Sequence, residues 1–173
     1  MNTLFLIGFM GAGKTSVSQC LGQLLHRTVV EMDQCIAEQE GMSIPEIFAQ
    51  KGEAYFRACE TALLEGFSNG EPCVVSCGGG VPMREENVAA MRRSGTVVLL
   101  TARPEVILER VRDDHNRPLL AGHKDIPYIM DLMEQRRPKY EAAADLIIDT
   151  SDRTITQICQ MVLQQTASSQ SNH

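Results

Sequence analysis

Residues 8–15 have the sequence GFMGAGKT, in which two glycines separated by four residues are followed by a lysine and a threonine. The apolar residues 4–7 before this stretch predict a strand, and the apolar residues within 17–25 have helical spacing. A glycine-rich loop between a strand and a helix directs backbone N–H groups toward one bound anion. The Lys14 ammonium can reach the outer phosphates of a nucleotide, and the Thr15 hydroxyl can be a ligand of Mg²⁺. We expect six residues to contact the nucleotide: Gly11, Ala12, Gly13, Lys14, Thr15 and Ser16.

Two carboxylates, Glu31 and Asp33, stand at the end of a second apolar run, residues 29–32. Strand alternation would turn both toward the same side, at the edge of the sheet that holds the phosphate-binding loop. One of them can orient water on Mg²⁺, and the other can accept a hydrogen bond, and also the proton, from a substrate hydroxyl. Asp33 is equally suited to be the N-cap of the helix that follows, so the sequence leaves both roles open.

Two arginines are candidates for binding an anionic substrate. Arg57 lies one helical turn from Glu53 and from Glu60, a spacing that is also typical of ion pairs on a helix surface. Arg57 can bind a substrate only if its helix faces the cleft. Arg136 and Arg137 are adjacent, and we expect them to follow a helix, so only one of them can face a given direction. The alternative for this pair is a basic helix C-terminus that complements the helix dipole.

Three consecutive glycines follow another apolar run, residues 73–76, after Cys77. A run of Gly78, Gly79 and Gly80 lets backbone N–H groups approach a ligand closely, although an ordinary loop is the alternative. Cys77 is interpreted as a packing residue.

The charged segment 110–124 lacks a helical pattern, and its length predicts a lid over the site. Arg117 is the candidate for closing over the transferred phosphate, because its charge is permanent and its donors form a fork.

The order of the apolar segments predicts a doubly wound α/β fold. Five runs, residues 4–7, 29–32, 73–76, 97–100 and 146–148, are continuous rather than alternating, as in parallel strands that helices cover on both faces. Residues 33–68 have room for two or three helices, and residues 155–163 show the clearest helical pattern. We expect one domain over residues 1–165, with a lid at about 112–124, and a disordered tail over residues 166–173.

Composition excludes several classes of function. The net charge of −6 argues against broad nucleic-acid binding, and no apolar stretch has the length of a membrane span. The absence of a basic region before residues 4–7 argues against a signal peptide, so we expect a cytoplasmic protein. The six cysteines are scattered and no histidine cluster accompanies them, so we expect neither a disulfide nor a structural metal. We also expect a monomer.

These motifs together resemble the shikimate kinases, and the resemblance covers about residues 2–165. The phosphate-binding loop is shared with many nucleotide-hydrolysing proteins, whereas the other motifs, in this order, are specific to that family. Besides GFMGAGKT, they are the acidic pair that ends at Asp33, GEAYFRACE around Arg57, SCGGG, RPLLAG at Arg117 and RRPKY at Arg136.

The resemblance implies a five-stranded P-loop fold like that of the nucleoside monophosphate kinases. It also implies transfer of a phosphoryl group from Mg²⁺–ATP to the 3-hydroxyl of shikimate, in aromatic biosynthesis. By the resemblance, Lys14, Asp33 and Arg117 are catalytic, Thr15 and Glu31 serve the metal, and Arg110, Arg117 and Arg153 lie by the nucleotide. The implied shikimate contacts are Asp33, Arg57, Gly78, Gly79, Gly80 and Arg136.

One position departs from the family, which usually has Asp where this chain has Glu31, so we expect an altered Mg²⁺ affinity. Two other interpretations remain at this point. One is a kinase of another hydroxy acid such as gluconate, and the other is a nucleotide-binding module without catalytic activity.

Overall fold

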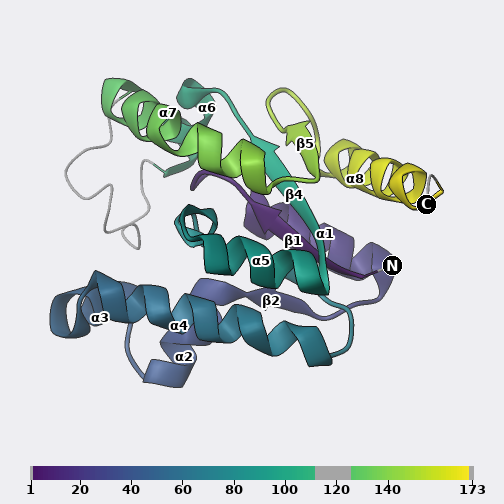
Figure 1. Ribbon diagram of the computed structural model, residues 1–173. Helices are drawn as coiled ribbons and strands as arrows, with labels where there is room; N and C mark the ends of the chain where they lie inside the picture. The colour runs from purple at the N-terminus through teal and green to yellow at the C-terminus, as the bar shows by residue number, and fades with distance from the viewer. Residues whose placement is uncertain (1, 112–125, 172–173) are drawn as a thin grey trace.

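Five parallel strands form one sheet in the order β2-β3-β1-β4-β5 (Figure 1). The computed structural model describes residues 2–111 and 126–171. The strands are β1 (Thr3–Ile7), β2 (Val29–Glu31), β3 (Val74–Ser76), β4 (Gly95–Thr101) and β5 (Leu146–Asp149). This arrangement confirms the predicted doubly wound sheet of five parallel strands.

Helices connect the strands, and the predicted segment 33–68 contains three of them. The α-helices are α1 (Lys14–Leu25), α2 (Met32–Glu40), α3 (Ile44–Lys51), α4 (Glu53–Glu65), α5 (Glu85–Ser94), α6 (Pro104–Val111), α7 (Ile126–Ala143) and α8 (Ile155–Gln170). Two 3₁₀ turns, η1 (Gly66–Asn69) and η2 (Val81–Met83), follow α4 and the glycine run. Ser43 and Thr154 begin α3 and α8 with capping boxes, in which side chain and backbone satisfy each other's hydrogen bonds.

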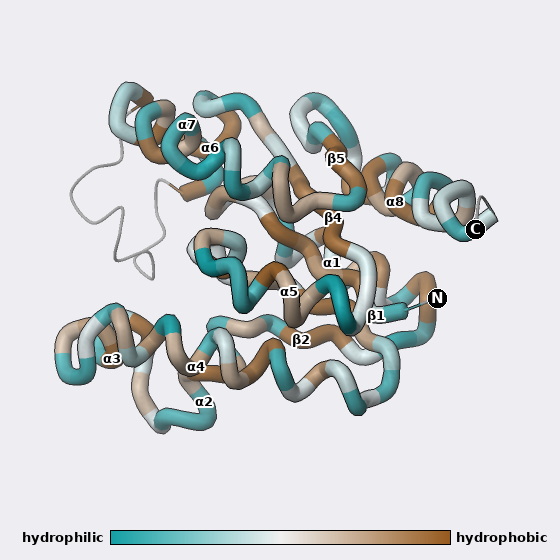
Figure 2. Tube along the Cα trace, viewed as in Figure 1, coloured by the Kyte–Doolittle hydropathy of each residue, from teal (hydrophilic) through white to brown (hydrophobic). Residues whose placement is uncertain are grey.

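Strand alternation divides the core into two layers, one on each face of the sheet. Leu4 and Leu6 pack with residues of α1 and α8, such as Leu21 and Val162. Phe5 and Ile7 point to the opposite face, where α4, α5, α6 and α7 supply the apolar partners. Figure 2 shows hydrophobic residues along the central strands, whereas hydrophilic residues alternate with them around the helices. The sheet is therefore buried on both faces, as expected of a parallel sheet.

A third apolar cluster lies outside these two layers. Ile36 of α2, Ile47 of α3 and Phe56 of α4 are buried against one another. These three helices lie together beside the β2 edge of the sheet (Figure 1). They have their own small core, so they form a unit that can hold side chains over the carboxyl ends of the strands.

The structure corrects three details of the sequence prediction. Met32 begins α2 rather than ending a strand, and Arg110 lies in α6 rather than in a loop. Arg136 lies inside α7 rather than after a helix, because packing of Tyr140 carries the helix past the Pro138 interruption.

The C-terminal helix is also longer than predicted. Helix α8 continues to Gln170, through most of the segment expected to be a disordered tail. Thr166 is buried and donates a hydrogen bond to the Val162 carbonyl at 2.8 Å, which extends the helix beyond its apolar stripe. Within residues 2–111 and 126–171, no helix has the length and apolarity needed to cross a membrane.

The contact between α1 and β2 gives a test of the fold. A Cβ atom at Gly22 would lie 2.2 Å from Cγ2 of Val29 and 3.1 Å from the Arg27 carbonyl oxygen. We expect Gly22→Ala to lower the free energy of unfolding by about 1–3 kcal/mol, because the helix must move away from the strand. Urea denaturation measures the change. Gly66→Ala is the matched control, since nothing lies within 4 Å of its Cβ position; an equal loss in both variants would contradict this packing.

Candidate active site

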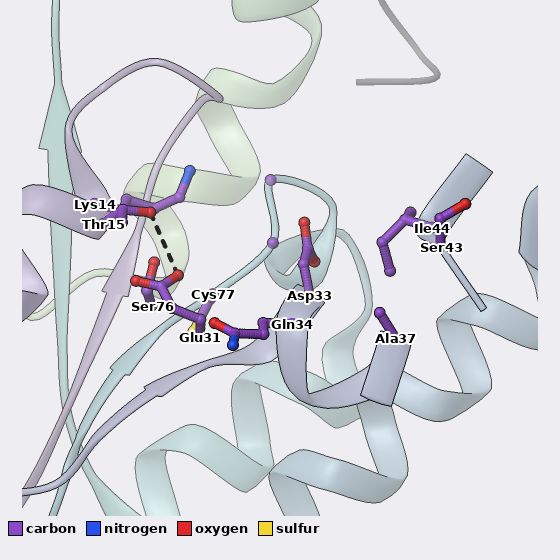
Figure 3. A pocket seen from close by; sticks show the side chains of 12 residues that line it. Lys14, Thr15, Glu31, Asp33, Gln34, Ala37, Ser43, Ile44, Ser76 and Cys77 are labelled. Atoms are coloured by element: carbon purple, nitrogen blue, oxygen red, sulfur yellow. Dashed lines mark hydrogen bonds between the residues drawn. The ribbon is translucent and has the colours of Figure 1, made fainter. Parts of the chain in front are cut away.

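The carboxyl ends of three neighbouring strands open into one cavity. The register aligns Glu31 of β2 with Ser76 of β3, and Ser76 in turn with Leu6 of β1. The loops that follow these strands therefore leave the sheet at one level. A cavity of about 400 Å³ lies there and runs from Lys14 to Ile44. Figure 3 shows Lys14 and Glu31 at one side of it, Ile44 at the other, and Asp33 between them.

The glycine-rich loop has the backbone conformation expected of an anion site. Gly13 adopts a left-handed conformation with φ of 101° directly before α1, so the first turn of that helix faces the cavity. The Lys14 ammonium donates hydrogen bonds to the carbonyls of Gly8 at 2.6 Å and Phe9 at 3.2 Å. The Lys14 side chain thus folds over its own loop. Its positive charge and the positive N-terminal end of the α1 dipole both favour an anion at this loop.

Glu31 connects the end of β2 to α1. Its Oε2 atom accepts a hydrogen bond from the Thr15 hydroxyl at 3.3 Å (Figure 3). Its Oε1 atom accepts one from the Ser18 hydroxyl at 3.1 Å. The two residues predicted to serve a metal therefore meet in the structure, and Ser18 is a partner that the sequence analysis did not identify.

Asp33 lies in the first turn of α2 and lines the same cavity. The N-cap of α2 is Glu31, without a side-chain capping hydrogen bond, so the interpretation of Asp33 as an N-cap is wrong. The predicted strand alternation ends at Glu31. Asp33 faces the cavity because of its position in the helical turn, not because of its position along a strand.

The three glycines after β3 are surrounded by charged side chains. A Cβ atom at Gly78 would lie 2.7 Å from Oε2 of Glu60 and 3.1 Å from Oδ1 of Asp33. At Gly79 it would lie 3.0 Å from Nη1 of Arg136. Side chains at these positions would displace Asp33 and Arg136, both predicted to bind substrate, and also Glu60.

The same relation holds for Gly80 and Arg57. A Cβ atom at Gly80 would lie 2.4 Å from Nη1 of Arg57, in direct overlap with the guanidinium. The structure therefore brings Asp33, Arg57 and Arg136 together at the glycine run, although they come from α2, α4 and α7. The alternative of a loosely packed loop does not agree with these distances.

Arg136 is a buried cation that forms no ion pair with an acidic side chain among the described residues. Its relative exposure is 9%, and the adjacent Arg137 forms its ion pair with Glu134 on the outer surface. Within residues 2–111 and 126–171, the Arg136 guanidinium donates only to the Tyr140 hydroxyl, at 3.4 Å, and forms no ion pair. It also lies over the Phe9 ring, 5.7 Å from the centroid. Burial of an unpaired charge is costly, so this position favours an anionic ligand.

Arg57 forms both ion pairs predicted from its spacing and also faces the site. Its guanidinium contacts Glu53 at 3.2 Å and the fully buried Glu60 at 2.7 Å. Burial lowers the pKa of Arg57, but the two carboxylates outweigh that effect and raise it. The ion pairs predicted from the spacing are therefore confirmed, and the role of Arg57 in substrate binding stays a prediction.

Glu60 is a buried acid that the sequence analysis left without a role. Burial raises its pKa from 4.5 to about 7, and Arg57 opposes this increase only in part. Its Oε2 atom has no hydrogen-bond partner in the described part of the chain and faces Gly78. Only the burial distinguishes Glu60 from Glu53, and burial is not visible in the spacing of the two residues around Arg57.

Two further contacts fix the surroundings of the nucleotide loop. Nη1 of Arg110 donates to the Gly11 carbonyl at 2.9 Å, and the buried Thr150 hydroxyl lies 2.9 Å from the Ala12 carbonyl. Arg153 donates to the Asp149 carbonyl at 2.7 Å, after β5. Arg110 thus borders the phosphate-binding loop, and Thr150 is a loop anchor that no sequence motif indicated.

Tyr140 ends the RRPKY motif, but sequence analysis assigned it no role of its own. Its hydroxyl donates to the Gly79 carbonyl at 2.6 Å, and burial raises its pKa, so it keeps the proton that it donates. Cys77 is buried, and burial raises its pKa too, which agrees with a packing role rather than a reactive thiol. The predicted lid at about 112–124, with Arg117, lies outside the described residues.

The fold and the site define a P-loop kinase: a parallel sheet with a nucleotide phosphate loop after β1, opposite a basic and acidic pocket. A family model described as shikimate kinase matches residues 10–167. The chain belongs to the shikimate kinase family.

Individual relatives agree with this assignment. Shikimate kinase of Dehalococcoides mccartyi is 40% identical over 93% of this chain and 91% of its own length. Shikimate kinase of Bacillus anthracis is 41% identical, over 91% and 94% of the two chains. Among solved structures, shikimate kinase from Acinetobacter baumannii in complex with shikimate has a TM-score of 0.92 at 34% identity, covering 98% of this chain and 94% of its own. A gluconokinase from Sinorhizobium meliloti, with a TM-score of 0.63 at 18% identity, shares the fold alone.

The raised pKa of Glu60 predicts a pH dependence of stability. Because the folded pKa of about 7 lies above the ordinary value of 4.5, the folded state binds more protons between these pH values. The contribution of Glu60 is fully present below about pH 4.5 and is lost as pH rises through about 7. We therefore expect Glu60→Gln to gain stability relative to the wild type between pH 5 and pH 8, by as much as about 3 kcal/mol.

Denaturant unfolding at several pH values measures this difference. Glu53→Gln is the matched control, because Glu53 also pairs with Arg57 but its side chain is 55% exposed. The difference in free energy of unfolding between Glu53→Gln and the wild type should stay constant across the pH range. A constant offset between Glu60→Gln and the wild type at every pH would show that the Glu60 pKa is not raised.

Proposed function

We propose that this chain transfers the γ-phosphoryl group of ATP to the 3-hydroxyl of shikimate, giving shikimate 3-phosphate and ADP in aromatic biosynthesis. The observation that carries the proposal is the buried guanidinium of Arg136, which forms no ion pair within the described residues and lies against Gly79. Gly79 lines the same cavity as Lys14. Shikimate has a carboxylate and several hydroxyls on a small ring, which are the groups that this pocket can recognise.

The nucleotide is held by the loop before α1. Backbone N–H groups of residues 11–16 and the Lys14 ammonium bind the β- and γ-phosphates, which replace the Gly8 and Phe9 carbonyls as partners of that ammonium. Arg110 keeps the loop in place through the Gly11 carbonyl and borders the nucleotide together with Arg153.

Thr15 and Glu31 suit a magnesium site. Within residues 2–111 and 126–171, no three His, Cys, Asp or Glu side chains cluster as a metal cage. Mg²⁺ commonly keeps several waters and uses few protein ligands together with substrate phosphates, so a single hydroxyl and a nearby carboxylate are sufficient. Thr15 would be the direct ligand, and Glu31 would hold its hydroxyl proton and a metal-bound water. Bound there, Mg²⁺ neutralises charge on the β- and γ-phosphates.

The acceptor is held from three helices. Arg57 and Arg136 bind the carboxylate with charge-assisted hydrogen bonds, and the N–H groups at Gly78–Gly80 approach the ring. Asp33 accepts a hydrogen bond from the reacting hydroxyl, which aims the oxygen at the γ-phosphorus.

The transfer is an in-line displacement. The hydroxyl oxygen forms a bond to the γ-phosphorus while the bond to the bridging β–γ oxygen breaks, and ADP leaves with the bond electrons. The hydroxyl proton passes to Asp33, or is released late while Asp33 only orients the oxygen. Lys14 stabilises charge on the phosphoryl group, and Arg117, which lies outside the described residues, is proposed to do the same.

The activity and the role of Asp33 can be tested together. We expect ADP release that depends on shikimate and does not occur with gluconate, measured in a coupled assay. Asp33→Asn should reduce kcat by about 10²–10⁴-fold, because the amide cannot accept the proton and orients the hydroxyl poorly. Glu38→Gln is the control on the same helix, since Glu38 pairs with Gln34 at the surface. Turnover of gluconate in place of shikimate would contradict the proposed substrate.

Adjacent arginines give a test of the carboxylate site. Arg136→Gln should raise KM for shikimate by about 10- to 100-fold while leaving KM for ATP unchanged, because it removes a charge-assisted bond to the carboxylate. Arg137→Gln removes the exposed neighbour, which pairs with Glu134, and should leave both constants unchanged. Steady-state kinetics with each substrate varied in turn measures the difference. Equal effects of the two substitutions would rule out this assignment of Arg136.

A further inference from the structure

Ser18 is a fully buried hydroxyl one turn into α1 from Thr15. Its Oγ atom lies 2.8 Å from the Thr15 carbonyl oxygen and 3.1 Å from Oε1 of Glu31. A serine hydroxyl has a single proton, so it can donate fully to only one of these acceptors. The carboxylate is the stronger acceptor because its hydrogen bond is charge-assisted, whereas the bond to the carbonyl one turn earlier is a local contact common to helical serines.

Glu31 is consequently held at both of its oxygens by α1. Ser18 donates to Oε1 and Thr15 donates to Oε2, so the carboxylate plane has a defined orientation relative to the phosphate-binding loop. When the Thr15 hydroxyl donates its hydrogen bond to Glu31, the lone pairs of the Thr15 oxygen are directed away from the carboxylate and are available to a cation. The orientation of Glu31 thus controls the orientation of Thr15.

The length of the Glu31 side chain makes the second anchor important. Glu has one more rotatable bond between its backbone and its carboxylate than Asp has. A longer side chain has more rotamers to lose, and losing them costs free energy unless a contact selects one. The buried Ser18 hydroxyl is the contact that selects one rotamer of Glu31 in the described structure.

We propose that Ser18 is a positioning residue for the Mg²⁺ site of this chain, acting through Glu31. The inference rests on the proposed function, in which Thr15 and Glu31 serve the metal. Ser18 does not touch the metal or either substrate. It holds the carboxylate that accepts a hydrogen bond from the Thr15 hydroxyl. Mutation of residues that orient metal-binding side chains in this way commonly changes metal affinity by about 10- to 100-fold.

Calorimetric titration of the protein with ADP, with and without Mg²⁺, tests the proposal without any turnover. In the wild type we expect ADP to bind more tightly when Mg²⁺ is present. In Ser18→Ala we expect the increase in ADP affinity caused by Mg²⁺ to be about 10-fold smaller, while the affinity for ADP alone is unchanged. Ser94→Ala is the matched control, because the Ser94 hydroxyl makes the same kind of contact one turn back in α5, to the Ala90 carbonyl at 3.0 Å. Within the described residues, its hydroxyl has no hydrogen bond to a carboxylate.

A second variant pair separates positioning from general packing. Glu31→Asp draws the carboxylate back from Ser18, so adding Ser18→Ala to Glu31→Asp should cost little further Mg²⁺ affinity, whereas independent effects would add. Thermal unfolding of every variant accompanies the titrations.

Each result has a distinct meaning. The proposal is supported if Mg²⁺ increases the ADP affinity of Ser18→Ala less than that of the wild type, while Ser94→Ala behaves like the wild type. The effect of Ser18→Ala must also not add to that of Glu31→Asp. An unchanged gain in Ser18→Ala, or an equal loss of ADP affinity with and without Mg²⁺, overturns it and leaves the proposed function intact. A wild type whose ADP affinity is independent of Mg²⁺ overturns the proposed metal site, and the role of Ser18 with it.

Discussion

Close approach of charged side chains to a backbone without Cβ atoms is the constraint on which this site depends. Asp33 and Glu60 lie against Gly78, Arg136 lies against Gly79, and Arg57 lies against Gly80. Two carboxyl groups and two guanidinium groups can lie this close to the loop only because its three glycines have no side chains. The glycine run therefore sets the spacing between the two guanidinium groups and the Asp33 carboxylate. In the proposed function, these groups bind the carboxylate and the reacting hydroxyl of the acceptor.

The same contacts connect the two halves of the site. The Arg136 guanidinium lies over Phe9 of the phosphate-binding loop, and Tyr140, one turn further along α7, donates to the Gly79 carbonyl. On the nucleotide side, Glu31 joins β2 to α1 through Thr15 and Ser18. A movement of α1 or α7 thus changes the geometry on both sides of the proposed site, which suits a reaction that depends on alignment rather than on covalent catalysis.

Most of the elements could be predicted from the sequence, because they depend on local patterns. The five apolar runs became five parallel strands, and the GFMGAGKT motif became a loop before α1. Predictions that depended on how a pattern ends were less accurate. Pro138 does not end α7, and α8 continues past its apolar stripe to Gln170. In both places buried side chains outside the repeating pattern, Tyr140 and Thr166, stabilise the longer helix.

The sequence by itself determined the class of fold, the phosphate-binding loop and the residue types needed for an anionic acceptor. Those inferences rely on spacing along the chain, which local geometry converts directly into structure. Only the tertiary structure decided that Arg136 rather than Arg137 is buried, that Glu60 rather than Glu53 carries a raised pKa, and that Ser18 reaches Glu31. Burial and contact between distant segments depend on how helices pack over the sheet. The two arginines look equivalent in the sequence, as do the two glutamates, until that packing removes water from one member of each pair and not from the other.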